Sequence, residues 1–422
     1  MVNEMEENNN QNDEINSKRE VYLDNAATTK LDAEVLDVML PYLKERYGNP
    51  GSMHNKGIQA KNAMDDARES VAKTLNCESE EIIFTGSGTE SDNLGIIGYA
   101  RKNKDKGNHI ITTKMEHHAV LDSFDRLKED GFEVTLIDND IDGLIDLKQL
   151  KESITNQTIL VSIIYANNEI GTIQDIKAIS KICKEKNVIF HTDACQATSY
   201  SEMDVKELGV DLMTLNGSKI YGPKGIGVLY KHKNLKIEPI VYGGGQEFNL
   251  RSGTENLANI VGFAKALELV TAHKEEEVKK LVNLRDYMIE NLLTIDRTRL
   301  NGHATKRLPN NVNISYLNIE GESLLLLLNE DGIYASTGSA CSSASLEPSH
   351  VIVALGLPHE LGHSSIRFSM GKDTTKEDLD YTIDKITKHV KYLRSISALN
   401  DTMDDVLNKT NKQEYGEGDN HE

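Results

Sequence analysis

A lysine and an aspartate that follow two apolar segments could act together in catalysis. Lys219 lies in the glycine-rich segment 216–227 (NGSKIYGPKGIG), directly after the apolar residues 210–215. Asp193 lies near the end of the apolar segment 188–194, twenty-six residues before Lys219. A desolvated lysine has a lowered pKa and can form a Schiff base, although a lysine among glycines could also be an ordinary loop residue. An acid for a pyridinium nitrogen and a lysine for an aldehyde are the two groups that pyridoxal phosphate requires.

A second glycine-containing turn could bind the phosphate of such a cofactor. The sequence TGSGTE at 85–90 follows a predicted strand and opens a predicted helix. Free amides at the start of a helix favour a phosphate, and glycine lets the backbone approach it closely. The hydroxyls of Ser87 and Thr89 and the amide of Gly88 are the expected donors, with a plain strand–helix turn as the alternative.

Other polar residues follow the predicted strands. His117 could stack on a planar ring or cap a helix, and Gln196 could bond a phenolic oxygen of that ring. Asn168 follows the most apolar strand, at the sheet edge where open α/β sheets bind ligands. Arg367 stands in a strand-like run, SSIRFS, and could bind a substrate carboxylate or form a salt bridge between domains.

Cys341 is surrounded by small residues in the segment STGSACSSAS, 336–345. Structural cysteines usually have apolar neighbours, so an exposed thiol on a mobile loop is expected here, as a sulfur carrier requires. Cys195 is the competing thiol, but its apolar surroundings predict burial and a high pKa. The four cysteines are scattered singly, so neither a disulfide framework nor a metal site is expected, apart from a transient bridge to a cluster through Cys341.

The composition is typical of a globular protein with an acidic surface. The 422 residues carry a formal charge of −20, which disfavours binding to nucleic acid or to an anionic membrane. No stretch approaches eighteen apolar residues, and no signal segment is recognisable, so a cytoplasmic protein is expected. Both ends are acidic and poor in apolar residues, which predicts disorder at 1–19 and at 395–422.

Short apolar runs alternate with helical patterns through most of the chain, which predicts a mostly parallel sheet between helices. The expected strands are 81–85, 109–113, 133–137, 158–165, 188–191, 211–215 and 226–230. The expected helices are 57–76, 89–102, 118–129, 146–153, 175–186, 257–294 and 376–394, the last with a capping box of Thr374 and Glu377. We therefore expect a large α/β domain at 20–262 and a smaller α+β domain at 263–394.

Several motifs together resemble the cysteine desulfurases of the NifS/IscS group, which are class V, fold-type-I pyridoxal-phosphate enzymes. The resemblance extends from about residue 22 to residue 394. It is carried by YLDNAATT, TGSGTESDN, EHHAVLDS, ANNEIGTIQDI, HTDACQA, GSKIYGPKGIG, GGGQE, RSGTEN and STGSACSSASLEPSHV. It implies a large domain with a mostly parallel seven-stranded sheet, a smaller α+β domain and a homodimer.

The resemblance also implies roles for particular residues. Lys219 would carry the cofactor, Asp193 would pair with its ring nitrogen, His117 would stack on the ring and Gln196 would contact its oxygen. Gly88 and Thr89 would bind the phosphate, together with Thr254 from the other subunit. Asn168 and Arg367 would hold L-cysteine, and Cys341 would accept its sulfur. An iron–sulfur scaffold or another sulfur-acceptor protein, such as one for tRNA thiolation, would then receive the sulfur.

The chain departs from the family pattern beside the lysine. The family usually has Ser-Gly-His-Lys where this chain has Asn216-Gly217-Ser218-Lys219, and a basic residue where this chain has Phe248. Asn216 and Ser218 can still donate hydrogen bonds, so cofactor binding is expected to persist. The alternatives are another class V enzyme, such as a selenocysteine lyase or an aminotransferase, and a non-catalytic scaffold that keeps the fold.

Overall fold

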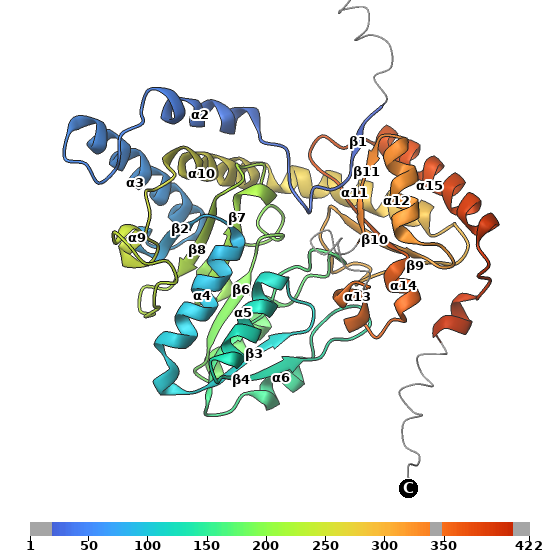
Figure 1. The fold of residues 1–422 in the computed structure, drawn as a ribbon, viewed down its shortest axis with the longest axis horizontal. Coiled ribbons are helices and arrows are strands. Elements are labelled where there is room, and N and C mark those ends of the chain that lie inside the picture. Colours follow the sequence, from blue (N-terminus) through green and yellow to red (C-terminus); the bar gives the residue numbers. More distant parts are fainter. Residues whose placement is uncertain (1–18, 338–347, 408–422) are drawn as a thin grey trace, which may run out of the picture.

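The computed structural model describes residues 19–337 and 348–407, which form a large and a small part joined by two consecutive helices (Figure 1). The strands are β1 (Val21–Tyr22), β2 (Ile82–Thr85), β3 (His109–Thr113), β4 (Glu133–Ile137), β5 (Thr158–Ser162), β6 (Ile189–Asp193), β7 (Leu212–Asn216), β8 (Gly227–Lys231), β9 (Thr298–Leu300), β10 (Asn311–Tyr316), β11 (Ile333–Tyr334), β12 (Ser336–Thr337) and β13 (Ser365–Ser369). The helices are α2 (Ala33–Lys44), α3 (Asn55–Leu75), α4 (Gly88–Lys102), α5 (His118–Glu129), α6 (Leu147–Ser153), α7 (Ile176–Glu185), α8 (Val205–Leu208), α9 (Gln246–Asn249), α10 (Leu257–Ala272), α11 (Lys274–Leu292), α12 (Gly321–Glu330), α13 (His350–Ala354), α14 (His359–His363) and α15 (Lys376–Ile396).

The large part contains the predicted seven-stranded sheet, in the order β2-β8-β7-β6-β5-β3-β4. Strand β8 runs antiparallel to both of its neighbours, and the other pairs are parallel. All seven predicted strands are present; 109–113 and 133–137 match at both ends, and the ends of the others differ by at most three residues. The fold class predicted from the alternation of apolar runs and helices is therefore confirmed.

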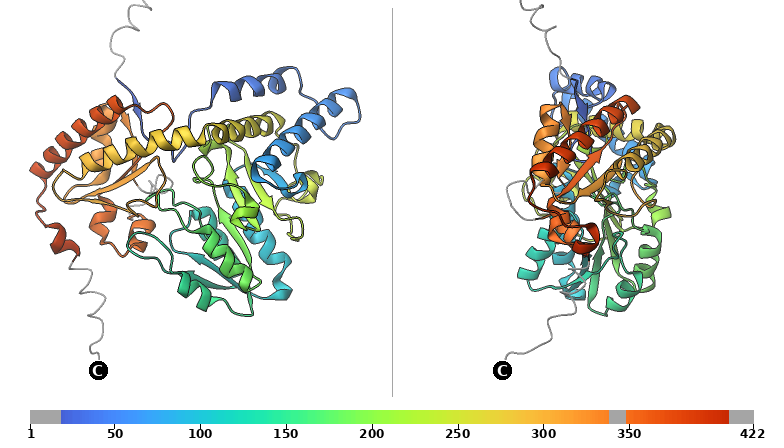
Figure 2. Two further views of the ribbon diagram at one scale, coloured as in Figure 1. Left: turned by 180° about the vertical axis from the view of Figure 1, so that it is seen from behind. Right: turned by 90° about the vertical axis from the view of Figure 1, so that its right-hand side faces the viewer.

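The sheet is buried on both faces because its strands alternate between two apolar cores. Neighbours such as Leu160 and Val161, or Leu212 and Met213, belong to different cores. One core includes residues of α4 and α5, and the other includes residues of α3, α7 and α10, so helices cover both faces (Figure 2). Burial on both faces explains why these strands read as continuous apolar runs.

The small part is built on an antiparallel sheet of order β12-β13-β10-β9, which packs against α11, α12 and α15. The N-terminal strand β1 also belongs here, because it pairs in parallel with β11. Val21 and Leu23 are fully enclosed in the core of the small part. The expectation that residues from 20 onward belong to the large domain is therefore wrong for this strand.

Two details of the predicted helices need correction. The expected single helix 257–294 is interrupted at His273, whose backbone is not helical, so α10 packs with the large part and α11 with the small part. The capping box of α15 is formed by Thr375 and Asp378, one residue later than predicted from Thr374 and Glu377. Helices α2 and α12 had not been predicted.

The start of the C-terminal segment is packed, contrary to the expectation of disorder from residue 395. Helix α15 continues to Ile396, and the Asn318 side chain donates a hydrogen bond to the carbonyl of Asp401. Val406 is 1% exposed and packs with Met403 and Leu407 against α13 and α14. These three apolar residues lie at the i, i+3, i+4 spacing of a helix. The prediction of disorder rested on the acidic charge of the segment and did not consider this spacing. Among the residues that the structure describes, no helix is both long and apolar enough to span a membrane.

This packing makes Val406 important for stability. Val406→Ala should lower the free energy of unfolding by about 2 kcal/mol, because two buried carbon atoms are lost and a cavity forms. Leu399→Ala is the matched control, since Leu399 is 53% exposed in the same segment. Urea unfolding would measure both variants. Equal midpoints for the two would show that Val406 is not held in the core.

Candidate active site

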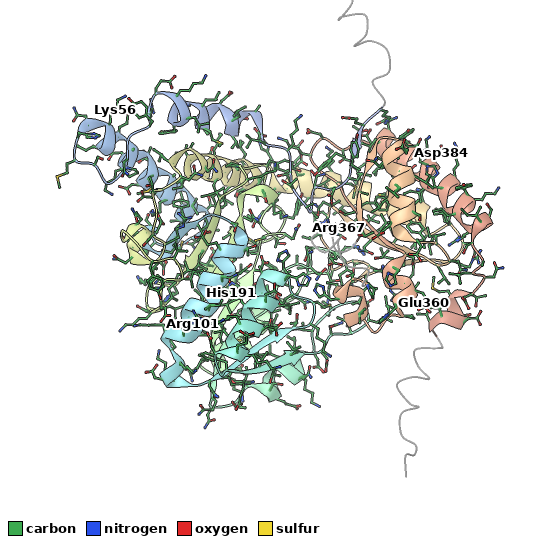
Figure 3. All side chains as sticks on the ribbon, viewed as in Figure 1. Lys56, Arg101, His191, Glu360, Arg367 and Asp384 are labelled. Atoms are coloured by element: carbon green, nitrogen blue, oxygen red, sulfur yellow. The ribbon has the colours of Figure 1, made fainter. Side chains whose placement is uncertain are left out.

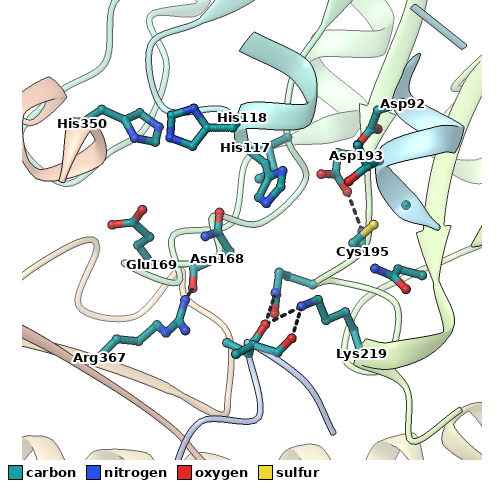
Figure 4. A pocket seen from close by; sticks show the side chains of 17 residues that line it. Asp92, His117, His118, Asn168, Glu169, Asp193, Cys195, Lys219, His350 and Arg367 are labelled. Atoms are coloured by element: carbon teal, nitrogen blue, oxygen red, sulfur yellow. Dashed lines mark hydrogen bonds between the residues drawn. The ribbon is translucent and has the colours of Figure 1, made fainter. Parts of the chain in front are cut away.

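Four adjacent strands bring their C-terminal ends to one pocket of about 330 Å³ (Figure 4). The segments after β3, β5 and β7 supply His117, Asn168 and Lys219, and β6 itself ends at Asp193. Parallel neighbouring strands end at the same edge, so the polar residues predicted to follow them meet here. Arg367 reaches the pocket from β13 and lies at the junction of the two parts (Figure 3).

Lys219 lies at the end of a short 3-10 helix, Gly217–Lys219, which directly follows β7. A side chain at position 217 would collide with Ile226 and with the carbonyl of Pro223, so only glycine fits this turn. The Lys219 ammonium donates hydrogen bonds to the carbonyl of Ala26, at 2.9 Å, and to that of Ala27. The lysine is therefore held by the N-terminal segment, with its amine inside the pocket.

Asp193 stands at the end of β6 and is 5% exposed. One of its carboxylate oxygens accepts a hydrogen bond from the amide of Cys195, at 2.9 Å. A second carboxyl, that of Asp92, is buried nearby, and burial together with the charge of Asp193 raises its pKa well above the usual range. Burial also raises the pKa of the Cys195 thiol, which confirms the expectation that this cysteine is a poor nucleophile.

His117 caps helix α5 and lines the pocket at the same time. Its Nδ1 accepts a hydrogen bond from the amide of Ala119, at 3.0 Å, which leaves the ring facing the pocket. Burial lowers the pKa of His117, with a smaller opposing effect from Asp193 and a further lowering by Lys219. The two readings of this residue, ring contact and helix cap, are therefore compatible.

The start of α4 has the free donors that a phosphate requires. Ser87 caps the helix by accepting from the amide of Glu90, and the amides of Gly88 and Thr89 have no protein acceptor among the described residues. A Cβ atom at position 88 would lie 2.8 Å from the Cys195 sulfur. Only glycine therefore lets the backbone approach the pocket this closely. These groups fit pyridoxal phosphate: the free amides suit its phosphate, the lysine its aldehyde, and the acid and the imidazole its ring.

Arg367 is 2% exposed and joins three parts of the chain. It donates to the carbonyl of Asn168 at 3.0 Å and forms an ion pair with Asp24 at 3.0 Å. Its Nε has no partner among the described residues, although it is buried. Both sequence-based interpretations therefore have support, because the arginine bridges segments and still has a donor for a ligand.

The structure brings most, but not all, of the predicted residues together. Gln196 and Asn216 line the pocket, and Gln196 donates to the carbonyl of Ala26 at 2.9 Å. Ser218 does not line it, because its hydroxyl turns back to the side chain of Asn216. Thr254 is also absent from the pocket of this single chain. Cys341 lies outside the described residues.

The sequence reasoning missed several residues at the pocket. Asp92 and Glu169 are buried acids of the lining, and Glu169 accepts a hydrogen bond from the hydroxyl of Ser349. Glu116 is a third buried acid, next in sequence to the lining residue His117. His350 bonds the carbonyl of Glu116 at 3.0 Å, and its ring lies 4.7 Å from that of His118. The second of the two acidic residues in TGSGTESD, close to the proposed phosphate turn, was the available signal for Asp92. His350 comes from a distant segment, so no local pattern could have placed it.

Comparisons with known proteins agree with this geometry. The family model described as aminotransferase class-V matches residues 21–382. The chain belongs to the class V aminotransferase family. It is 51% identical over 381 residues to the cysteine desulfurase IscS of Dictyoglomus turgidum, covering 90% of this chain and 97% of that protein. It is 52% identical over 379 residues to the IscS of Methanosarcina thermophila, covering 90% and 94%.

A solved structure titled NifS-like protein is 37% identical, with a TM-score of 0.84, and the match covers 89% of this chain and all of that one. A second one, titled SspA in complex with cysteine, is 34% identical, with a TM-score of 0.75 and coverages of 83% and 98%. The predicted membership of the NifS/IscS group of cysteine desulfurases is therefore confirmed.

Glu116 predicts a specific dependence of stability on pH. Burial raises the pKa of Glu116 to about 8, and its Oε2 has no partner among the described residues. The folded state thus binds the proton more tightly than the unfolded state, whose pKa is about 4.3. Stability from this group is complete below that value and is lost as the pH rises towards 8.

Glu116→Gln should remove this dependence, because the amide resembles the protonated acid. Between pH 5 and pH 8, the unfolding free energy of the cofactor-free wild type should fall by a few kcal/mol more than that of the variant. Denaturant unfolding at the two pH values measures this. The control is Glu129→Gln, whose side chain is 74% exposed at the C-terminal end of α5, the helix that begins two residues after Glu116. Parallel pH profiles for wild type and Glu116→Gln would refute the assignment of a buried protonated acid.

Proposed function

We propose that the protein is a pyridoxal-phosphate-dependent cysteine desulfurase that moves the sulfur of L-cysteine to Cys341 and releases L-alanine. The observation that carries the proposal is one pocket that holds a lysine, an acid and an imidazole beside two free helix amides. The names of the relatives support the same activity. Pyridoxal phosphate, when bound, supplies an electron sink for the substrate's α-carbon.

Each residue has a task that follows from its position. Lys219 would hold the cofactor covalently and move a proton at its Nζ, while Asp193 would pair with the ring nitrogen. His117 would lie against the ring as a neutral imidazole, since its pKa is lowered. Gln196 and Asn216 would orient the ring from the adjoining loops, and Ser218 would support Asn216 through its hydrogen bond.

The phosphate and the substrate would be bound at opposite sides of the pocket. Gly88 and Thr89 would bind the phosphate through their amides, joined by Thr254 of the partner subunit in a homodimer. Arg367 and Asn168 would bind the carboxylate of L-cysteine, and the buried Nε of Arg367 is available for it.

Sulfur transfer balances when the thiol of Cys341 becomes a persulfide and L-cysteine becomes L-alanine. The acceptor that later takes this sulfur would be an iron–sulfur scaffold or another acceptor protein. Cys195 lines the pocket, but burial raises the pKa of its thiol, which disfavours it as the sulfur acceptor.

Lys219→Ala tests the lysine assignment. The variant should lose all turnover, and borohydride should fix no pyridoxal phosphate on the protein, because Lys219 is the one lysine among the described residues that line the pocket. Mass spectrometry of the reduced peptides measures this. Lys224→Ala, an exposed lysine of the same glycine-rich segment, is the control and should label at residue 219 like wild type. Label on another lysine in Lys219→Ala would disprove the assignment.

Cys341→Ser tests the sulfur acceptor. The variant should still bind the cofactor and change its absorbance on addition of L-cysteine, because the pocket residues are intact. It should release at least ~100-fold less alanine, since a hydroxyl is a poor nucleophile towards sulfur. Alanine release and mass spectrometry of cysteine-pulsed protein are the measurements, with Cys195→Ser as the matched control. A persulfide on Cys195, or full alanine release by Cys341→Ser, would overturn the proposal.

A further inference from the structure

A second cavity, of about 200 Å³, lies behind the lysine segment and shares no lining residue with the active-site pocket. Ile220 and Tyr221, which directly follow Lys219, form one of its walls. Helix α10 and the start of α11 form another wall, at the break between them. The cavity therefore lies where the two parts of the protein meet, next to the catalytic segment but separate from the pocket.

Two side-chain oxygens of this cavity have no hydrogen-bond partner among the described residues. Ser199 is 5% exposed, and its buried Oγ is unpaired. The Oε2 of Glu277 is buried and unpaired as well. An unsatisfied buried carboxylate oxygen is costly, and a ligand that donates hydrogen bonds would remove the cost. The two oxygens therefore favour a ligand with more than one donor.

The charge of the lining favours a cation. Asp32, Glu34 and Glu277 are acidic, and Lys372 is the only lysine or arginine among the lining residues. The ammonium of Lys372 already pairs with Asp32 and lies over the ring of Tyr221, 5.0 Å from its centre. Glu34 pairs with Lys265 at 3.4 Å, outside the lining, which leaves Glu277 as the acid of the cavity without a cationic partner among the described residues. A buried carboxylate gains most from a positive partner that also donates a hydrogen bond.

The remaining walls are apolar and would suit a hydrocarbon body. They are formed by Ile220, Ala266, Leu269 and Val270, with the ring of Tyr200 beside them. A wholly hydrated inorganic cation would gain nothing from these walls. Apolar walls with a few convergent polar groups are the usual composition of a site for a small organic molecule.

We propose that this cavity binds a small organic cation that carries N–H donors on an apolar body. Its N–H groups would bond Glu277 and Ser199, and its body would lie against Leu269 and Val270. The bound cation would touch Tyr221, whose amide donates to Thr29 and whose hydroxyl accepts from the amide of Lys372. The site is thus connected to both the lysine segment and the small part, without any contact to the active-site pocket.

Three molecules of almost the same shape test the charge requirement. Benzamidinium is a flat cation with N–H donors, benzamide is its neutral counterpart and benzoate is the anionic one. An amidinium also avoids the reaction of a primary amine with pyridoxal phosphate. In ligand-observed NMR titrations of the holoenzyme, benzamidinium should bind at least tenfold more tightly than benzamide, and benzoate, which Arg367 of the active-site pocket could also attract, should not displace benzamidinium. Equal binding of all three, or binding of none, would overturn the proposal.

Variants locate the site and separate it from the acidic active-site pocket. Glu277→Gln should weaken benzamidinium at least tenfold, equivalent to about 1.4 kcal/mol, and Ser199→Ala should weaken it less. Glu276→Gln makes the same change one residue earlier, at an exposed position outside the cavity lining, and should leave the affinity unchanged. Unchanged affinity in both Glu277→Gln and Ser199→Ala would place the binding elsewhere and refute the proposal. Because the readout is binding of a probe, this result is independent of whether the desulfurase activity is present.

Discussion

The structure depends on one constraint, which is that four buried parallel strands end at the same edge of one sheet. Strands β7, β6, β5 and β3 are neighbours, so the first polar residues after each of them have to share one small volume. Buried polar groups need hydrogen-bond partners. Here most of these partners are backbone groups of neighbouring segments: the carbonyl of Ala26 accepts from Lys219, and the carbonyl of Asn168 accepts from Arg367. Lysine, carboxylate and imidazole are thereby held together without a single long loop.

The N-terminal segment joins the two parts of the protein at this edge. Its carbonyls at Ala26 and Ala27 hold the Lys219 ammonium, and its Thr29 binds the carbonyl of Ser218. A few residues earlier, Asp24 pairs with Arg367 of the small part. A shift of the small part would therefore be transmitted to the lysine through residues 24–29, and the proposed cation cavity adjoins the same lysine segment.

The sequence predicted the elements and residues whose signals are local. Continuous apolar runs revealed the seven strands, and the polar residues predicted to follow them, such as Asp193 and Lys219, line one pocket. What could not be predicted depends on contacts between distant segments. The pairing of β1 with β11 and the approach of His350 to His118 are examples. The break at His273 was not predicted, because the residues on both sides of it have one continuous helical pattern. The packing of Val406 was not predicted, because the short apolar pattern lies within an acidic segment.

The central claim is that this pocket removes sulfur from L-cysteine and leaves alanine. The most direct test is a product analysis of the purified holoenzyme with L-cysteine and a thiol reductant. We predict that alanine and reducible sulfur appear in equal amounts, matching the cysteine consumed. Pyruvate and ammonia in place of alanine, or the absence of any turnover in a protein shown to hold the cofactor on Lys219, would contradict the claim.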